Sequence, residues 1–336
     1  MDSTYKLPIP SSLSSGSNTP FTIKKRRYVR AKKSFSLLST LFLAIVIINI
    51  IEDRYIAHNK LEIEYSIIRS FPLKTYSRLQ GFICRIKYPW PLNLAIVGLF
   101  KNLVGISLVD AERSSLREYS SINDLFTRKL AQSARPLGRG VISPVDGTVM
   151  YAGEVGGSKQ KIKGVVYREE DLVNLTAFPS RQKVDNKMYQ IVIYLSPANY
   201  HRFHTFLDFQ LEEIKHVPSQ LFSVGKGPMR YLKGLLSKNE RVVFSGRTCW
   251  GYGALVAVGS TGVGSITTPF APIKTNRFFQ QQSDIKNYPV SFMLGKGDEL
   301  GNFNLGSTVV LFFEAPSEFE LTCSEGVVRL GESLGE

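Results

Sequence analysis

The feature that most restricts the fold is a series of short β-rich runs after residue 130. Four of these runs combine β-branched and aromatic residues and are divided by Gly, Pro and Asp: residues 147–152, 189–195, 254–259 and 308–314. Such runs predict strands joined by turns, and too few helical patterns lie between them for a doubly wound α/β sheet. We therefore expect an α+β chain in which residues 131–336 form a mainly antiparallel β domain.

The N-terminal part predicts a membrane anchor. Residues 1–33 begin with a Ser- and Pro-rich stretch and end with seven basic residues, which predicts a disordered or targeting segment. Residues 34–51 carry no charge and are long enough to cross a bilayer as one helix. The alternatives are a secretory signal or a buried core helix. The preceding cations predict that the N-terminus stays on the cytosol-like side, with the rest of the chain across the membrane.

The next part, residues 52–130, is expected to be helical and membrane-associated, and to end with a helical stretch around residues 121–130. It contains a second apolar stretch at 92–109, which Lys101 interrupts, and a charge in mid-span argues against a second crossing. An interfacial or core helix is therefore expected, with Tyr88 and Trp90 at the level of the lipid headgroups.

Charge and cysteine content restrict the partners. The chain has 42 Lys and Arg against 28 Asp and Glu, a net charge of +14, which favours an anionic partner. Because the densest cations directly precede the apolar run and no nucleic-acid-binding motif follows, we expect a membrane and no nucleic acid. Three widely separated cysteines, Cys84, Cys249 and Cys323, predict core thiols and neither a disulfide framework nor a zinc site.

Three short segments carry residues suited to chemistry. His201 and His204 directly follow the predicted strand 189–195, where side chains can reach a cleft, although H-x-x-H alone is a weak signal. Asp146 lies in an Asp-Gly turn, whose ordinary role is structural. Gly306 and Ser307 precede the predicted strand 308–314. There the glycine offers an unhindered carbonyl and the serine a nearby hydroxyl, which suits an intramolecular N-to-O acyl shift.

These segments, in this order, resemble those of the phosphatidylserine decarboxylase family. Further segments are similar to the family between residues 65 and 315, including 126–130, 134–136, 216–218, 239–241 and 296–303. A second Gly-Ser-Thr lies at 259–261, but only Ser307 follows a Lys-Gly-Asp-Glu-Leu-Gly-x-Phe segment. Ser260 is therefore predicted to be structural.

The resemblance implies self-cleavage between Gly306 and Ser307 into chains 1–306 and 307–336, which stay together as a heterodimer. Ser307 becomes a covalent pyruvoyl group that serves decarboxylation of phosphatidylserine to phosphatidylethanolamine, with no metal. His204 takes the proton of Ser307 while Asp146 orients the imidazole, and His201 donates a proton during decarboxylation. The same resemblance and the N-terminal composition predict a single-pass protein of the mitochondrial inner membrane, with its catalytic domain in the intermembrane space; other membranes also fit.

Rival interpretations predict different products. A membrane-bound serine hydrolase using Asp146, His204 and Ser307 would remain one chain, although the Gly-x-Ser-x-Gly elbow is missing around Ser307. A non-catalytic membrane-anchored binding module would have no reason to combine Asp146, both histidines and the Gly306-Ser307 pair. A member of the same family that acts on another amino-acid headgroup also fits the motifs.

Overall fold

The structure, a computed structural model, describes residues 73–155, 160–162, 165–167, 172, 185–224, 234–262, 265–277, 284–304 and 306–336. The chain divides into two compact units, Met1–Ile50 and Ile51–Glu336, and all described residues belong to the second. The predicted segments 1–33 and 34–51 lie outside the described residues. Within the described residues, no helix has both the length and the apolar character that a bilayer crossing requires.

Short helices precede the strands. Helix α3 spans Leu73–Arg85, and helix α4 spans Leu92–Val104 within the predicted apolar stretch. Helix α4 ends because Gly105 adopts a left-handed conformation with φ of 82° and its N–H bonds back to the Lys101 carbonyl. The predicted helix at 121–130 is shorter than expected: α5 covers Ile122–Phe126, with Ser121 capping its start.

An eight-stranded antiparallel sheet forms the centre of the described fold, which confirms the mainly antiparallel β prediction. Its strands are, in spatial order, β11 (Lys286–Leu294), β7 (Phe209–Val217), β8 (Arg241–Thr248), β9 (Gly251–Gly259), β13 (Ser307–Ala315), β5 (Lys187–Leu195), β2 (Gly147–Glu154) and β14 (Gly326–Val328). Strand β13 is hydrogen-bonded to β9 on one edge and to β5 on the other.

The central strands bury both of their faces. In β13, Val309 and Leu311 pack into one apolar core, whereas Val310 and Phe312 pack into a second core on the other face. Side chains alternate between the faces of a strand. Ser307 therefore faces the same side as Val309 and Leu311.

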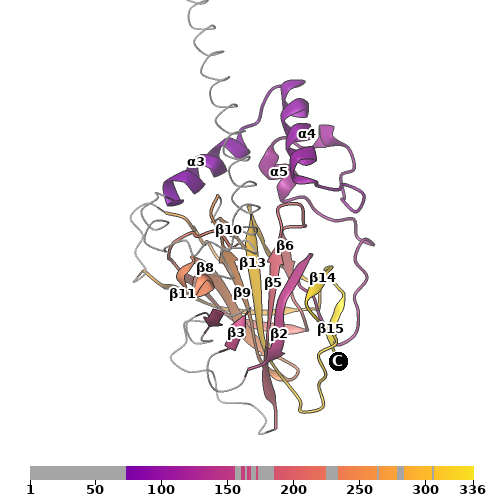
Figure 1. Cartoon of the computed structure of the whole chain (residues 1–336), viewed down its shortest axis with the longest axis vertical. Coiled ribbons are helices and arrows are strands. Elements are labelled where there is room, and N and C mark those ends of the chain that lie inside the picture. The colour runs from indigo at the N-terminus through magenta and orange to yellow at the C-terminus, as the bar shows by residue number, and fades with distance from the viewer. Residues whose placement is uncertain are drawn as a thin grey trace, which may run out of the picture. The chain divides into compact units, whose positions relative to one another are not determined.

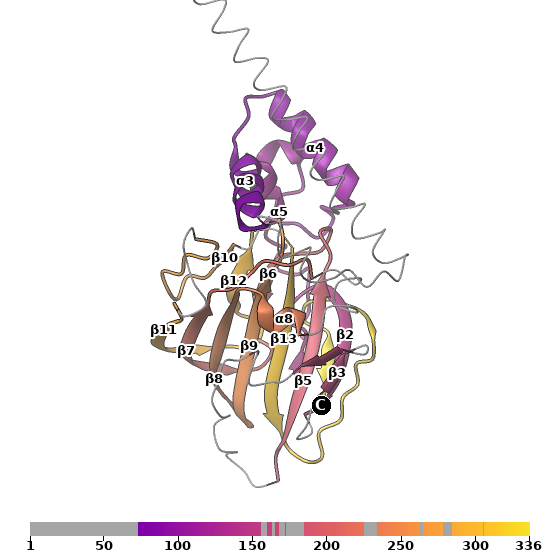
Figure 2. The same cartoon turned by 60° about the vertical axis from the view of Figure 1, so that its left-hand side comes forward.

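A smaller sheet covers that face near the site. Its order is β10 (Ile266–Thr267), β12 (Glu299–Phe303) and β6 (Arg202–His204), and Phe203 and Phe303 join the core of Val309 and Leu311. Figures 1 and 2 show α3, α4 and α5 together beyond one end of the large sheet, next to β6 and β10. The remaining described elements are η1 (Leu116–Glu118), β1 (Val141–Ile142), β3 (Gln160–Ile162), β4 (Val165–Tyr167), α8 (Leu235–Lys238) and β15 (Ser333–Gly335).

The cysteine prediction is correct only in part. Cys84 is buried and Cys323 is half-buried, but Cys249 is exposed, so it is not a core thiol. Cys249 lies in the tight turn between β8 and β9, where the chain reverses at the surface. None of the three cysteines, all of which are described, forms a disulfide.

Candidate active site

The four predicted site residues come from segments at one end of the large sheet. Ser307 at the start of β13 pairs with Leu195 at the end of β5, and Thr148 near the start of β2 pairs with Tyr194. Asp146 and Ser307 therefore lie at the same sheet end, on either side of β5. The chain that leaves β5 leads through residues 196–200 to His201 and then to β6.

Ser307 is buried in an unusual way. The residue is only 1% exposed, and its Oγ has no hydrogen-bond partner among the described residues. A buried hydroxyl without a partner costs free energy and calls for a functional explanation. Gly306 before it has a φ of 55°, a conformation that favours glycine. The serine hydroxyl is thus held beside a peptide bond that no side chain of residue 306 obstructs.

His201 is fully buried against α5. Its ring centroid lies 3.9 Å from that of Phe126, and its Nδ1 lies 2.8 Å from the Asn199 carbonyl oxygen. A carbonyl only accepts hydrogen bonds, so Nδ1 carries the proton and Nε2 holds a lone pair. That Nε2 is buried without a partner among the described residues. Burial lowers the pKa of His201 to about 3.

His204, on β6, has partners for both ring nitrogens. Nδ1 donates to the Gly297 carbonyl at 2.8 Å, and Nε2 accepts from the Tyr200 hydroxyl at 3.0 Å. Burial lowers the pKa of His204 and raises that of Tyr200, so the imidazole is neutral and the phenol keeps its proton at neutral pH.

Asp146 is held by a cation and a backbone amide. Arg135 donates two hydrogen bonds to its carboxylate, at 3.1 and 2.6 Å, and Leu330 N–H donates a third at 2.8 Å. Arg135 also bonds Asp110 at 2.8 Å, and the Asp146 bonds raise the pKa of the guanidinium. The sequence predicts that Asp146 orients the His204 ring, but Asp146 makes no hydrogen bond to that ring in the described chain. The backbone N–H of His204 instead bonds the carbonyl of Pro144, which lies close to Asp146 in the sequence, at 3.0 Å.

Comparison with known proteins identifies the family. The family model for phosphatidylserine decarboxylase matches residues 122–336, which include all four site residues. The chain belongs to the phosphatidylserine decarboxylase family. The resemblance predicted from the sequence is therefore confirmed.

Members of the decarboxylase family from animals, fungi and bacteria are similar over most of the chain. The mitochondrial phosphatidylserine decarboxylase proenzyme of Cricetulus griseus is 34% identical, with 81% of this chain and 74% of that protein covered. The mitochondrial proenzyme 1 of Schizosaccharomyces pombe is 29% identical, covering 81% and 82%. The proenzyme of Nitrosococcus oceani is 35% identical, covering 79% and 88%. All three are named as proenzymes.

Three further residues lie in the candidate site, although the motifs assigned them no role. Tyr200 and Arg135 contact His204 and Asp146 directly. Arg128 is a buried cation: Nη2 donates to the Ala198 carbonyl at 3.1 Å, whereas Nη1 has no partner among the described residues. Burial is the largest cause of the lowered pKa of His201, and the positive charge of Arg128 lowers that pKa further. The only signal was that each residue lies inside a segment similar to the family.

The pH dependence of stability should report the buried histidines of this decarboxylase. An exposed imidazole titrates near 6.5, but burial lowers the pKa of His201 to about 3. The unfolded chain then binds a proton that the folded chain does not, so this contribution to stability is complete above about pH 6.5 and is lost as the pH falls toward 3. In an uncut Ser307→Ala background, His201→Asn should reduce the loss of unfolding free energy between about pH 7.5 and about pH 5, measured by urea denaturation. An unchanged pH dependence would contradict a buried neutral His201.

Proposed function

We propose that this chain converts phosphatidylserine into phosphatidylethanolamine with a pyruvoyl group that it makes from its own Ser307. The observation that supports the proposal best is the buried Ser307 hydroxyl, which has no partner among the described residues and follows a glycine with positive φ. In a family whose members are named proenzymes, a serine in this position fits a self-processing step.

Maturation in this proposal begins when Ser307 Oγ attacks the Gly306 carbonyl carbon. The peptide C–N bond breaks and an ester C–O bond forms, which leaves a free amine on residue 307. Loss of the Cα proton then breaks the Cβ–O bond, so Gly306 keeps the oxygen as its carboxylate and residue 307 becomes dehydroalanine. Water replaces the nitrogen, ammonia leaves, and a ketone remains. One water molecule is consumed for each ammonia released.

His204 is the proposed base for the first step. Its Nε2 holds the lone pair, because Nδ1 donates to Gly297. The Tyr200 hydroxyl already donates to Nε2, so the Ser307 proton reaches His204 after Tyr200 moves aside or through the Tyr200 hydroxyl. The charges of Glu299 and Asp298 raise the pKa of His204 against the effect of burial. In this proposal Asp146, clamped by Arg135 near the backbone of His204, adds to that negative charge.

His201 is the proposed proton donor in decarboxylation. The pyruvoyl carbonyl supplies the electron sink that ordinary side chains lack. The carbon that loses carbon dioxide must regain a proton from a nearby acid. His201 is placed for this role by its ring geometry: Nδ1 is held by the Asn199 carbonyl, and Nε2, which has no partner among the described residues, is the atom that can take up a proton and return it to this carbon.

Exposed apolar side chains support a membrane setting for this protein. Large apolar side chains are exposed on and around α3 and α4, including Phe82, Trp90 and Leu99, and such a group fits an interfacial surface. We extend the proposal to a single-pass protein of the mitochondrial inner membrane with the catalytic domain in the intermembrane space. The predicted anchor at 34–51 and the mitochondrial names of several relatives support this location.

The test measures headgroup turnover with two kinds of inhibitor. Purified protein should release phosphatidylethanolamine from phosphatidylserine vesicles, hydroxylamine should abolish the activity by reacting with a ketone, and a fluorophosphonate should leave it unchanged. A serine hydrolase would give the reverse pattern and would release fatty acid. Labelling of Ser307 by the fluorophosphonate would therefore refute the proposal.

A further inference from the structure

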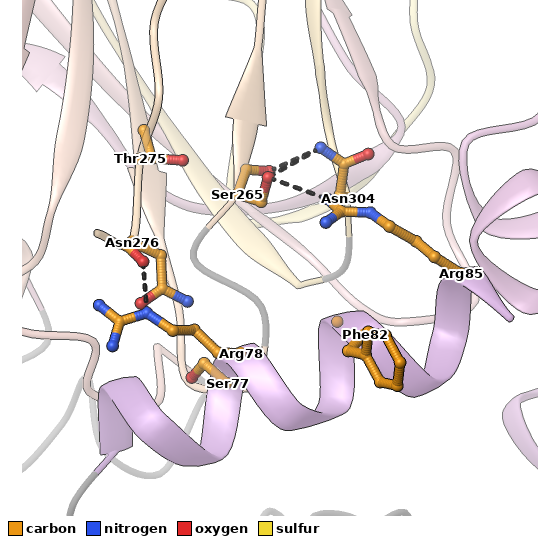
Figure 3. Close-up of a pocket in the computed structure, with 9 residues that line it drawn as sticks. Ser77, Arg78, Phe82, Arg85, Ser265, Thr275, Asn276 and Asn304 are labelled. Atoms are coloured by element: carbon orange, nitrogen blue, oxygen red, sulfur yellow. Dashed lines mark hydrogen bonds between the residues drawn. The ribbon is translucent and has the colours of Figure 1, made fainter. Parts of the chain in front are cut away.

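A cavity of about 250 Å³ lies between helix α3 and the segment that leads to Ser307 (Figure 3). Its lining contains two arginines and no carboxylate, so its walls favour an anion. The polar residues come from α3, from both sides of β10, and from the residue after β12: Ser77, Arg78, Arg85, Ser265, Thr275, Asn276 and Asn304.

At one end of the cavity, two side-chain donors hold the hydroxyl of Ser265. Arg85 Nη2 donates to Ser265 Oγ at 3.3 Å, and Asn304 Nδ2 donates to the same oxygen at 3.1 Å. A hydroxyl has two lone pairs and one hydrogen. Both lone pairs of Ser265 are engaged, and its hydrogen has no acceptor among the described residues. The hydroxyl is thus available to donate to a ligand oxygen beside a guanidinium.

The backbone holds this end firmly. Asn304 N–H bonds the Ser265 carbonyl at 2.9 Å, and Asn304 Nδ2 bonds the same carbonyl at 3.2 Å. At the other end of the cavity, Arg78 Nε bonds the Asn276 carbonyl at 2.6 Å. Figure 3 shows the two arginines at opposite ends, with Arg85 directed toward Ser265 and Asn304. Arg85 is therefore the cation next to the Ser265 hydroxyl.

The cavity adjoins the site of the chemistry. Asn304 precedes Ser307 by three residues, a separation of at most about 11 Å even in a fully extended chain. Asn123 of α5 bonds Asn304 Oδ1 at 3.4 Å, and Phe126 of the same short helix packs on His201. Helix α5 thus contacts both the cavity wall and the buried imidazole.

We propose that this cavity binds the phosphodiester of the substrate headgroup, with the Arg85 guanidinium and the Ser265 hydroxyl as donors. This inference rests on the function proposed above. In a phosphoserine headgroup, one methylene separates the phosphate ester oxygen from the carbon that loses carbon dioxide, so the phosphate must lie close to residue 307. Guanidinium groups bind phosphate oxygens through charge-assisted hydrogen bonds.

The rim of the cavity fits a lipid and not only a free anion. Phe82, which also lines the cavity, lies one turn before Arg85 on α3 and is 65% exposed. An exposed aromatic side chain at the mouth provides an apolar contact for the glycerol and acyl chains as they leave toward a bilayer.

The kinetic test uses a short-chain, water-soluble phosphatidylserine. Arg85→Gln should raise KM about tenfold, because hydrogen bonds to charged groups contribute enough to change affinity by that factor. The turnover number and the fraction of self-cleaved chain should stay close to wild type, and Arg85→Lys should give an intermediate KM. Arg117→Gln, which removes an exposed arginine on η1, is the matched control and should leave KM unchanged.

A binding test separates this inference from the proposed function. Calorimetry with glycerophosphoserine on the uncut Ser307→Ala chain involves no turnover, and both Arg85→Gln and Ser265→Ala should weaken binding. Equal affinities and equal KM values for Arg85→Gln and its parent would overturn the inference even if both are cleaved and active. Arg85-dependent binding of inorganic phosphate with an unchanged lipid KM would also overturn it, since the cavity would then be a site for free anions. A wild-type chain that never cleaves would count against the proposed function instead.

Discussion

A Ser307→Ala chain is expected to remain in one piece and to lose all decarboxylase activity. Alanine has no hydroxyl to attack the Gly306 carbonyl and no oxygen to eliminate, so neither the acyl shift nor the ketone can form. Intact mass spectrometry should find residues 307–336 as a separate peptide only in the wild-type protein, lighter by one ammonia than the encoded peptide.

Ser260→Ala is the matched control for this experiment, because Ser260 lies in the other Gly-Ser-Thr. Its Oγ accepts a hydrogen bond from Val224 N–H at 3.2 Å, the kind of structural role predicted for it. This variant should cleave normally and lose no more than about 1–2 kcal/mol of stability. Cleavage that depends on Ser260, or an active wild-type chain that is never cut, would overturn the pyruvoyl mechanism.

The pair formed by Arg135 and Asp146 should be needed for both stability and cleavage. Their side chains are about one-tenth exposed, and Arg135 also neutralises Asp110. Removing one partner of a buried ion pair leaves an uncompensated charge, so Arg135→Ala should cost about 3–5 kcal/mol of unfolding free energy in the Ser307→Ala background. In the active chain, Asp146→Asn keeps the shape but removes the charge. It should slow self-cleavage on the order of 100-fold or more.

A double variant and a control pair make this prediction specific. Replacing both partners with apolar residues of similar size, Arg135→Met with Asp146→Leu, should recover most of the stability but none of the cleavage. Arg113 and Asp124 form a more exposed pair, so Arg113→Ala should cost roughly 1 kcal/mol or less and leave cleavage unchanged. Normal cleavage in Asp146→Asn would remove Asp146 from the maturation step.

The strands were predictable because their pattern is local. The β-rich runs at 189–195 and 308–314 correspond to β5 and β13, and the placement of His201 just after β5 followed from the end of a run. The contacts that define the site are not local. Gly297, which binds His204, is 93 residues away from it in the sequence. Nothing in the segment around Arg135 indicates that its guanidinium folds back onto Asp146 in preference to solvent.

The sequence pattern also did not predict how short helix α5 is. The apolar spacing around 121–130 is helical, but Thr127 departs from helical geometry after five helical residues, and the next residues run toward the site, where Arg128 bonds the Ala198 carbonyl. Tertiary contacts of this kind override a local preference. They also carry Arg128 into the buried site.

The position of β13 in the sheet determines the order in which folding and the proposed cleavage occur. This strand is the fifth of eight and is hydrogen-bonded along both edges, so it can be inserted only while the chain is continuous or at the cost of reopening the sheet. Folding must therefore come before cutting. Once cut, the protein consists of two peptides that must associate again after any complete unfolding. Its native state then depends on the processing that the chain has undergone as well as on its sequence.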